Sequence, residues 1–287
     1  MENFDKKIQN KLSSYRSEET PSDASVEKML SKLDQVLPKE DKVKPISTLK
    51  EKKSSLGLIY KLVASVTIFF LMFYTTYRWN EMSVVVGNAA HKVWILPDGS
   101  KVKINAGSEL RYNKLLWVFE RKVTLTGEAF FEVKKGEKFV VDSELGTTQV
   151  LGTSFNIFAR VKSYEVRCST GSVRVTSKST NDQVLLKPGE GVTFKTQSLQ
   201  PFEFDVANDK DWRKGAFFFD ETIFESVIAE LERQYNVEIS YPKDYANLLY
   251  SGYFDNQNLA KALKLVCEPV GLEYQQKGKK IKFTALE

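Results

Sequence analysis

The feature that decides the organisation of this chain is one apolar run, Leu56-Gly-Leu-Ile-Tyr-Lys-Leu-Val-Ala-Ser-Val-Thr-Ile-Phe-Phe-Leu-Met-Phe-Tyr-Thr-Thr-Tyr77. Its only charged residue is Lys61, close enough to one end for the long side chain to reach the lipid head groups. As a helix the run would be about 33 Å long, and the hydrocarbon core of a bilayer is roughly 30 Å thick. Tyrosines near both ends and Trp79 just beyond suit the two membrane interfaces. We therefore predict one transmembrane helix over residues 56–77. A buried core helix over residues 62–77 is the alternative.

The charges that flank the run predict its orientation. Six lysines lie between Lys39 and Lys53, whereas the fifteen residues from Arg78 contain only Arg78 and Lys92 as basic residues. Because the more basic flank stays in the cytoplasm, the N-terminus is expected to be cytoplasmic. The run begins too far along the chain for a cleaved signal peptide, so the helix is expected to remain as an anchor.

Residues 1–55 are expected to be a helical tail that binds a partner. They contain 12 basic and 10 acidic side chains, which is typical of solvated helices. Two narrow apolar stripes at helical spacing supply the candidate partner-binding residues, which are Phe4, Ile8, Leu12, Tyr15, Val26, Met29, Leu30, Leu33 and Val36. Two such short helices bury little surface against each other, which favours folding on a cytoplasmic target. A self-packed hairpin or a helix on the membrane surface are the alternatives.

Residues 78–206 are predicted to form an all-β domain. Short alternating runs recur, among them Lys101–Asn105 and Tyr164–Cys168, and Pro97-Asp-Gly-Ser100 is a turn sequence. Glycines at 87, 107, 127, 152, 171 and 191 are taken as turn markers spaced by 19 to 25 residues. This spacing favours a solenoid-like coil, with a twisted sandwich as the second choice.

Residues 207–287 are predicted to be a separate α+β module. Strands and helices alternate in the order β-α-β, β-α-β-β, and the first helix is expected to start at a capping box, Thr222-Ile-Phe-Glu225. The fold class is thus mixed: helical tail, transmembrane helix, all-β domain and α+β domain.

The residues that usually carry chemistry are scarce. His91 is the only histidine, which removes most zinc sites and histidine-based catalytic triads, and it is expected at the surface. Gly152-Thr-Ser154 lacks the final glycine of a nucleophile elbow, and Gly189-Glu-Gly191 lacks the rest of a dinucleotide loop. Glu128 and Glu132 are interpreted as solvated surface residues.

These observations predict that the chain is not an enzyme and that it has no catalytic, cofactor-binding or metal-binding residue. Cys168 and Cys267 are expected to be buried free thiols, because their spacing gives no disulfide framework, and a disulfide on the oxidising side of a membrane is the alternative. The net charge of +5 comes from basic residues spread along the chain, so direct nucleic-acid binding is not expected.

Several motifs resemble one family in the order in which that family has them. Trp94-Ile-Leu-Pro-Asp-Gly-Ser-Lys-Val-Lys-Ile-Asn-Ala-Gly-Ser-Glu-Leu-Arg-Tyr112 resembles the start of the FecR-type periplasmic domain. Arg121-Lys-Val-Thr-Leu-Thr-Gly-Glu-Ala-Phe-Phe-Glu-Val133 and Val150-Leu-Gly-Thr-Ser-Phe-Asn-Ile157 continue the resemblance, as does Leu186-Lys-Pro-Gly-Glu190. Trp212-Arg-Lys-Gly-Ala-Phe-Phe-Phe219 and Leu231-Glu-Arg-Gln-Tyr-Asn-Val237 are similar to the C-terminal domain of Bacteroidota relatives, itself similar to the secretin and TonB short N-terminal module.

The resemblance implies a transmembrane anti-sigma factor of the inner membrane. Such a protein holds an extracytoplasmic-function sigma factor through its cytoplasmic tail and receives a signal from the signalling domain of a TonB-dependent outer-membrane transporter. Intramembrane and periplasmic proteases then free the tail. Relatives commonly carry a tail tryptophan, which is missing here, so the tail is assigned by position and amphipathicity. A non-catalytic structural component of an envelope transport or assembly complex is the alternative function.

Overall fold

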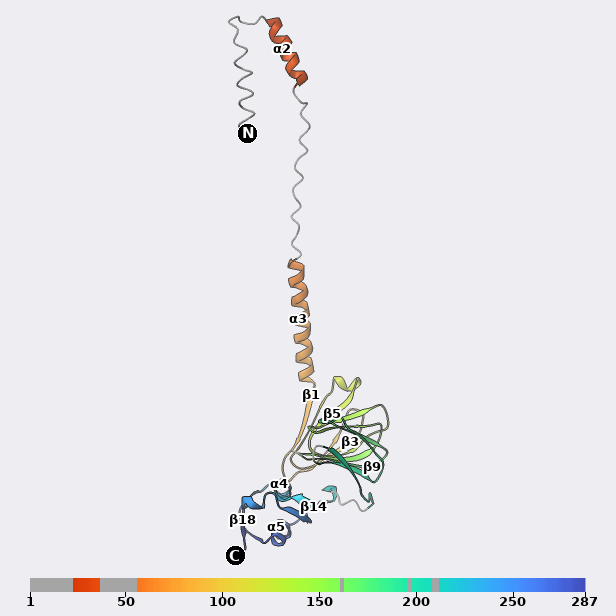
Figure 1. The fold of residues 1–287 in the computed structure, drawn as a ribbon, viewed down its shortest axis with the longest axis vertical. Helices are drawn as coiled ribbons and strands as arrows, with labels where there is room; N and C mark the ends of the chain where they lie inside the picture. Colours follow the sequence, from red (N-terminus) through yellow and green to blue (C-terminus); the bar gives the residue numbers. More distant parts are fainter. Residues whose placement is uncertain (1–22, 37–55, 161–162, 196–197, 208–211, 287) are drawn as a thin grey trace. The chain divides into compact units, whose positions relative to one another are not determined.

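The computed structural model describes residues 23–36, 56–160, 163–195, 198–207 and 212–286. The chain divides into two compact units, residues 1–66 and 67–287, and the division falls inside one long helix. Figure 1 shows the fold with its element labels.

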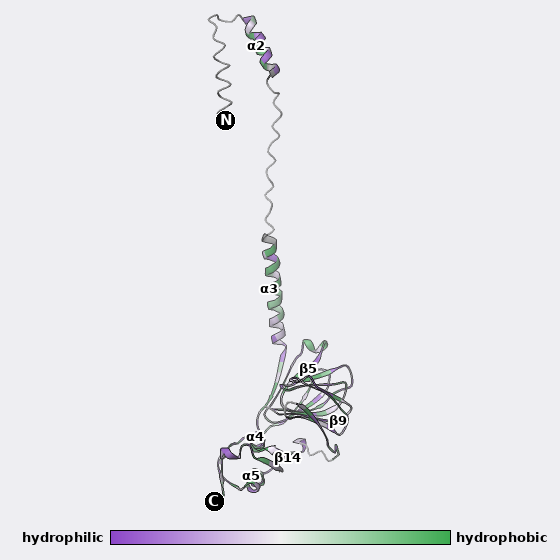
Figure 2. Cartoon of the chain, viewed as in Figure 1, coloured by the Kyte–Doolittle hydropathy of each residue, from purple (hydrophilic) through white to green (hydrophobic). Residues whose placement is uncertain are grey.

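The first part of the chain contributes two helices. Helix α2 spans Asp23–Val36, and helix α3 spans Leu56–Trp79. Helix α3 contains the predicted transmembrane run and extends it by two residues, to Trp79. Figure 2 shows that α3 is largely apolar along its length, whereas α2 mixes polar and apolar residues.

The β domain is a two-layered sandwich whose sheets share strand β5 (Arg121–Glu132). The first sheet has the order β1-β4-β5-β6-β7-β10-β11, with β1 Glu81–Val86, β4 Ser108–Asn113, β6 Phe139–Asp142, β7 Gly146–Val150, β10 Val173–Ser177 and β11 Gln183–Leu186. The second has the order β2-β3-β5-β8-β9-β12-β13, with β2 Lys92–Ile95, β3 Lys101–Ile104, β8 Ser154–Arg160, β9 Ser163–Thr170, β12 Glu190–Lys195 and β13 Ser198–Glu203.

One core lies between the two sheets. Alternate residues of the strands point inward, so that Val123 and Leu125 from the first half of β5 join Phe131 from its second half in the same buried cluster. Phe131 stacks on Phe155 of β8 with ring centroids 5.1 Å apart.

The all-β character of this domain is confirmed, but the solenoid is wrong. A solenoid coils in parallel rungs, whereas the described strands here pair antiparallel, with β5–β6 as the exception. The twisted sandwich, the second choice, is the better description. Two of the glycines interpreted as turn markers, Gly127 and Gly191, lie inside strands. Gly127 has φ +104° and marks the point where β5 passes from one sheet to the other, because β4 pairs with it up to Thr126 and β8 from Gly127.

The C-terminal module has its own buried cluster. Its helices are α4 Phe224–Tyr235 and α5 Leu259–Cys267, and its strands are β14 Ala216–Ile223, β15 Glu238–Ser240, β16 Leu249–Asp255, β17 Leu272–Lys277 and β18 Lys280–Ala285. Strands β14 and β16 form an antiparallel ribbon, and a second sheet has the order β15-β18-β17. Apolar faces of both helices pack on these sheets around Phe224, Phe254 and Leu263.

The expected capping box at Thr222 is wrong. Strand β14 continues to Ile223, and Thr222 pairs with Tyr250 of β16 instead of capping α4. The Thr222 hydroxyl donates to the carbonyl oxygen of Asp220 at 3.2 Å. Cross-strand pairing therefore extends through the position that the local motif assigned to the cap.

Short 3₁₀ turns connect several elements. They are η2 Leu116–Val118, η3 Trp212–Lys214, η4 Lys243–Tyr245 and η5 Glu268–Val270.

Candidate functional site

Helix α2 carries the second apolar stripe of the tail on an open surface. Val26, Met29, Leu30 and Leu33 are between 41% and 65% exposed. Val36 is the last residue of α2, and Phe4, Ile8, Leu12 and Tyr15 lie outside the described residues. The structure therefore shows an apolar face that no described residue covers, as a partner-binding helix requires.

Helix α3 meets the requirements for a membrane span. Residues Ile59–Trp79 are long and apolar enough to cross a bilayer, and none of this window is buried by the protein. Phe70 and Met72 in the middle are 63% and 69% exposed. The alternative of a buried core helix is therefore wrong for the described structure.

A buried polar network joins the β domain to the C-terminal module, and Glu128 of β5 is at its centre. The carboxylate accepts hydrogen bonds from Asn105 Nδ2 at 2.8 Å and from Asn156 Nδ2 of β8 at 2.9 Å. Both asparagine side chains also accept a hydrogen bond from the C-terminal module. Asn105 Oδ1 accepts from Gln234 Nε2 at 2.9 Å, and Asn156 Oδ1 accepts from Trp212 Nε1 at 3.0 Å. Each Glu128 oxygen is thus linked through one amide to a residue of the module.

Charges of both signs surround this carboxylate. Helix α4 places Glu230 in the interface, where it accepts from Gln234 Nε2 at 2.8 Å and from Arg233 at 2.6 Å. Arg160 at the end of β8 forms an ion pair with Glu230 at 3.7 Å, while its Nη1 and Nη2 atoms donate to the carbonyl oxygens of Gly107 and Ala106, respectively. The Arg160 Nε atom is buried without a hydrogen-bond partner.

The pKa of Glu128 responds to these surroundings. Burial raises the pKa of Glu128 from 4.5 to about 7, and the negative charge of Glu230 acts in the same direction. Arg160 and the two amide donors oppose the shift. The interface therefore holds a carboxyl that titrates near neutral pH.

Aromatic side chains complete the contact. Trp212 is 7% exposed and packs edge-to-face on His91, with ring centroids 5.3 Å apart. The guanidinium of Arg213 lies 3.4 Å from the ring centroid of Phe130, a β5 residue that belongs to the core of the module. Because Phe130 points away from the sandwich core that Phe131 enters, β5 contributes to both cores.

The interpretation of Glu128 as a solvated residue is therefore wrong, since the C-terminal module covers it. Glu132 remains partly exposed and forms an ion pair with Lys103 at 3.5 Å, so the two glutamates do not form a pair. His91 is exposed at the edge of the interface, and its Nε2 lies 3.1 Å from Gln234 Oε1. Cys168 and Cys267 are buried free thiols, as expected.

Sequence reasoning missed Asn105, Asn156, Arg160 and Gln234 as parts of one site. The available signal was the outward face of β5, where Glu128 and Phe130 alternate with the buried Ala129 and Phe131. A large aromatic such as Phe130 on the outward face of a strand indicates that something covers this face.

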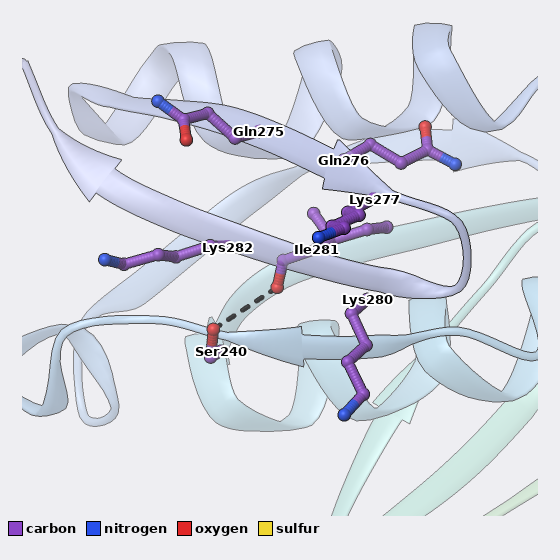
Figure 3. A pocket seen from close by; sticks show the side chains of 7 residues that line it. All are labelled: Ser240, Gln275, Gln276, Lys277, Lys280, Ile281 and Lys282. Carbon is purple, nitrogen blue, oxygen red and sulfur yellow. Dashed lines mark hydrogen bonds between the residues drawn. The ribbon is translucent and has the colours of Figure 1, made fainter.

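The surface of the C-terminal module is shallow. A depression of about 380 Å³ lies on the β15-β18-β17 sheet and is lined by Ser240, Gln275, Gln276, Lys277, Lys280, Ile281 and Lys282 (Figure 3). The Ser240 hydroxyl donates to the Ile281 carbonyl at 3.3 Å and is engaged within the sheet. A second depression of about 450 Å³ lies beside His91 and Gln234. Among the described residues no cluster of three or more His, Cys, Asp or Glu side chains could hold a metal ion.

Comparisons with known proteins identify both folded parts. The FecR protein family matches residues 82–174, and the FecR C-terminal family matches residues 216–283. The chain belongs to the FecR family. The two matches span 93 and 68 residues, more than half of the 287-residue chain.

Two crystal structures of a candidate anti-sigma factor from Parabacteroides distasonis are similar to this FecR-family chain. Each is 29% identical over 72% of this chain and 100% of the other, with TM-scores of 0.66 and 0.65. No curated protein matches the chain. The family and these structures support an anti-sigma factor role.

Proposed function

We propose that this FecR-family chain is a single-pass anti-sigma factor of the inner membrane. Its tail, residues 1–55, binds an extracytoplasmic-function sigma factor in the cytoplasm, α3 crosses the membrane, and residues 78–287 lie in the periplasm. The observation that carries the proposal is the exposed apolar face of α2. This helix precedes α3 in the chain, and α3 is an apolar helix whose membrane-length window is not buried by the described residues. The basic flank before α3 supports a cytoplasmic tail.

The periplasmic part is proposed to work by binding. The signalling domain of a TonB-dependent outer-membrane transporter contacts the C-terminal module, residues 207–287, and proteolysis in or near the membrane then releases the tail. The polar network around Glu128 supports this route, because it connects the module to the β domain that continues from α3. A signal that changes how the module sits on the β domain therefore has a defined contact to act on.

The binding role of the tail is tested with two matched variants of residues 1–55. Replacing Leu30 and Leu33 by Asp puts two charges into the apolar stripe, whereas replacing Ser31 and Gln35 by Asp puts the same charges on the opposite face of α2. Because burying an unpaired carboxylate costs several kcal/mol, the first variant should bind the sigma factor more than about tenfold more weakly. The Ser31 and Gln35 variant should bind like the unchanged tail.

Binding of these peptides is measured by calorimetry against the sigma factors of the same cell. Equal affinities of the two variants would show that the apolar stripe of α2 is not part of the interface with the sigma factor. Recovery of no sigma factor by the unchanged tail would contradict the proposed function as a whole and favour a structural role in the envelope.

A further inference from the structure

The loop between β4 and β5 exposes an unusual run of apolar side chains. It contains Lys114-Leu-Leu-Trp-Val-Phe-Glu120, and we refer to residues 114–120 as the apolar loop. Val118 and Phe119 are each 84% exposed, and Leu115 and Leu116 are 39% and 36% exposed. Isolated exposed apolar residues are common, but four within five positions indicate a surface that meets an apolar partner.

The apolar loop has a fixed conformation. Trp117 is buried and packs edge-to-face on Tyr112 and Phe139, at 5.4 and 6.0 Å between ring centroids. Asn113 Oδ1 accepts from the backbone N–H groups of Leu115 and Leu116, at 2.9 and 3.2 Å. Because Trp117 fixes the 3₁₀ turn to the core, the residues after it are held facing outward.

The same loop is attached to the C-terminal end of α3. Asn113 Nδ2 donates to the carbonyl oxygen of Tyr77 at 2.7 Å, and the Lys114 N–H donates to the carbonyl oxygen of Asn80 at 2.9 Å. In the sequence, Trp79 lies between Tyr77 and Asn80, and its side chain is 90% exposed. The exposed apolar residues of the loop therefore lie next to the end of the apolar helix.

We propose that the apolar loop inserts Val118 and Phe119 into the leaflet on the C-terminal side of the bilayer that α3 crosses. This inference rests on the proposed membrane span. The partner of the apolar loop is inferred to be lipid, because the loop is hydrogen-bonded to the end of α3 where that helix leaves the membrane. Aliphatic and aromatic tips beside a lysine, here Lys114, suit the boundary between acyl chains and head groups. The contact would hold the β domain against the membrane surface in one orientation.

The test places a fluorescent probe at Val118 in the full-length protein. The variant Val118→Cys is labelled with an environment-sensitive dye and reconstituted in phosphatidylcholine–phosphatidylglycerol nanodiscs that contain lipids with a spin-label quencher on the acyl chain. The native Cys168 and Cys267 are buried and so are poorly accessible to the dye. Phe70→Cys in α3 reports the span, and Leu185→Cys on β11 is the matched control, because it is 57% exposed and lies at the opposite edge of the first sheet from β1.

The inference predicts that the acyl-chain quencher acts on the Val118 probe at least about threefold more strongly than on the Leu185 probe. Equal quenching at Val118 and Leu185, with strong quenching at Phe70, would overturn the loop insertion and leave the span in place. Absence of quenching at all three positions would contradict the span and the insertion together. Energy transfer between labelled copies, without lipid quenching at Val118, would assign the loop to a contact between chains and also overturn the inference.

A second variant keeps the test independent of the label position. Replacing Val118 and Phe119 by Asp should leave the fold intact, because both side chains are exposed. A probe at Leu115→Cys should then lose its quenching in this double variant and keep it in the otherwise unchanged protein. Equal quenching in both backgrounds would contradict insertion of Val118 and Phe119.

Discussion

Replacing Glu128 by glutamine should flatten the pH dependence of the stability of the FecR domain and its C-terminal module. Glu128 has a pKa of about 7 in the folded protein, chiefly because it is buried and also because Glu230 is near, against an ordinary value of 4.5. Between these two values the folded state binds more protons than the unfolded state. The contribution of Glu128 to stability is therefore present at low pH and is lost as the pH rises towards and through 7.

The size of this loss follows from the two pKa values. At 1.36 kcal/mol for each pH unit, the difference corresponds to about 3 kcal/mol over the whole titration, and most of it falls between pH 5 and pH 8. Glutamine carries no charge at any of these pH values. It can accept from only one of Asn105 and Asn156 through its oxygen, and the lost hydrogen bond costs about 1 kcal/mol at all pH values. The slope with pH is thus the diagnostic quantity, and the absolute stability is not.

The assay is urea unfolding of residues 80–287 from pH 5 to pH 8, followed by tryptophan fluorescence. This fragment is suitable because the Parabacteroides chain of the crystal structures matches 72% of this chain over its own full length. Glu132→Gln is the matched control, since Glu132 lies on the same face of β5 but is 39% exposed in its side chain. The control should keep the pH dependence of the unchanged protein. Parallel profiles for Glu128→Gln and the unchanged protein would refute the assignment of this titration to Glu128.

Three further changes have defined outcomes. Gly127→Ala should destabilise the β domain by several kcal/mol in the same assay, because φ is +104° and the new Cβ would lie 2.7 Å from the backbone Cα of Ser108. An unstrained Gly→Ala change stabilises a protein slightly, so a loss under about 1 kcal/mol would contradict this geometry. Trp212→Phe should cost about 1 kcal/mol, because it removes the hydrogen bond to Asn156 and keeps an aromatic ring in the interface; an unchanged urea midpoint would show that this bond contributes nothing. Replacing Ala64, Ser65 and Thr67 in α3 by Leu should slow release of the tail after induction, because small and polar residues ease the unwinding of a helix for a protease. Release is measured by immunoblotting, and an unchanged rate would show that α3 is only an anchor.

The sequence predicted best where a single physical requirement dominates. The apolar run Leu56–Tyr77 needs only length and composition to be recognised, and it is helical throughout. The alternating runs Lys101–Asn105 and Tyr164–Cys168 correctly predicted strands β3 and β9, because one face of each strand is buried.

The pairing of strands that are distant in the sequence could not be predicted from the sequence alone. Glycine spacing could not distinguish a solenoid from a sandwich, because both place turns at regular intervals and differ only in which strands hydrogen-bond. The same limit hid the interface. Asn105 and Gln234 are 129 positions apart, and only the folded chain brings them to hydrogen-bonding distance. Local motifs also failed where tertiary pairing competes, as at Thr222, which joins a strand instead of capping a helix.

The central claim is that the tail of this membrane protein holds a sigma factor. Its most direct test is affinity purification of the full-length chain from membranes, in parallel with a variant that lacks residues 1–55, followed by mass spectrometry of the bound proteins. The proposed function predicts an extracytoplasmic-function sigma factor bound to the full-length chain and absent from the truncated one. Recovery of no sigma factor, or equal recovery with both chains, would contradict it.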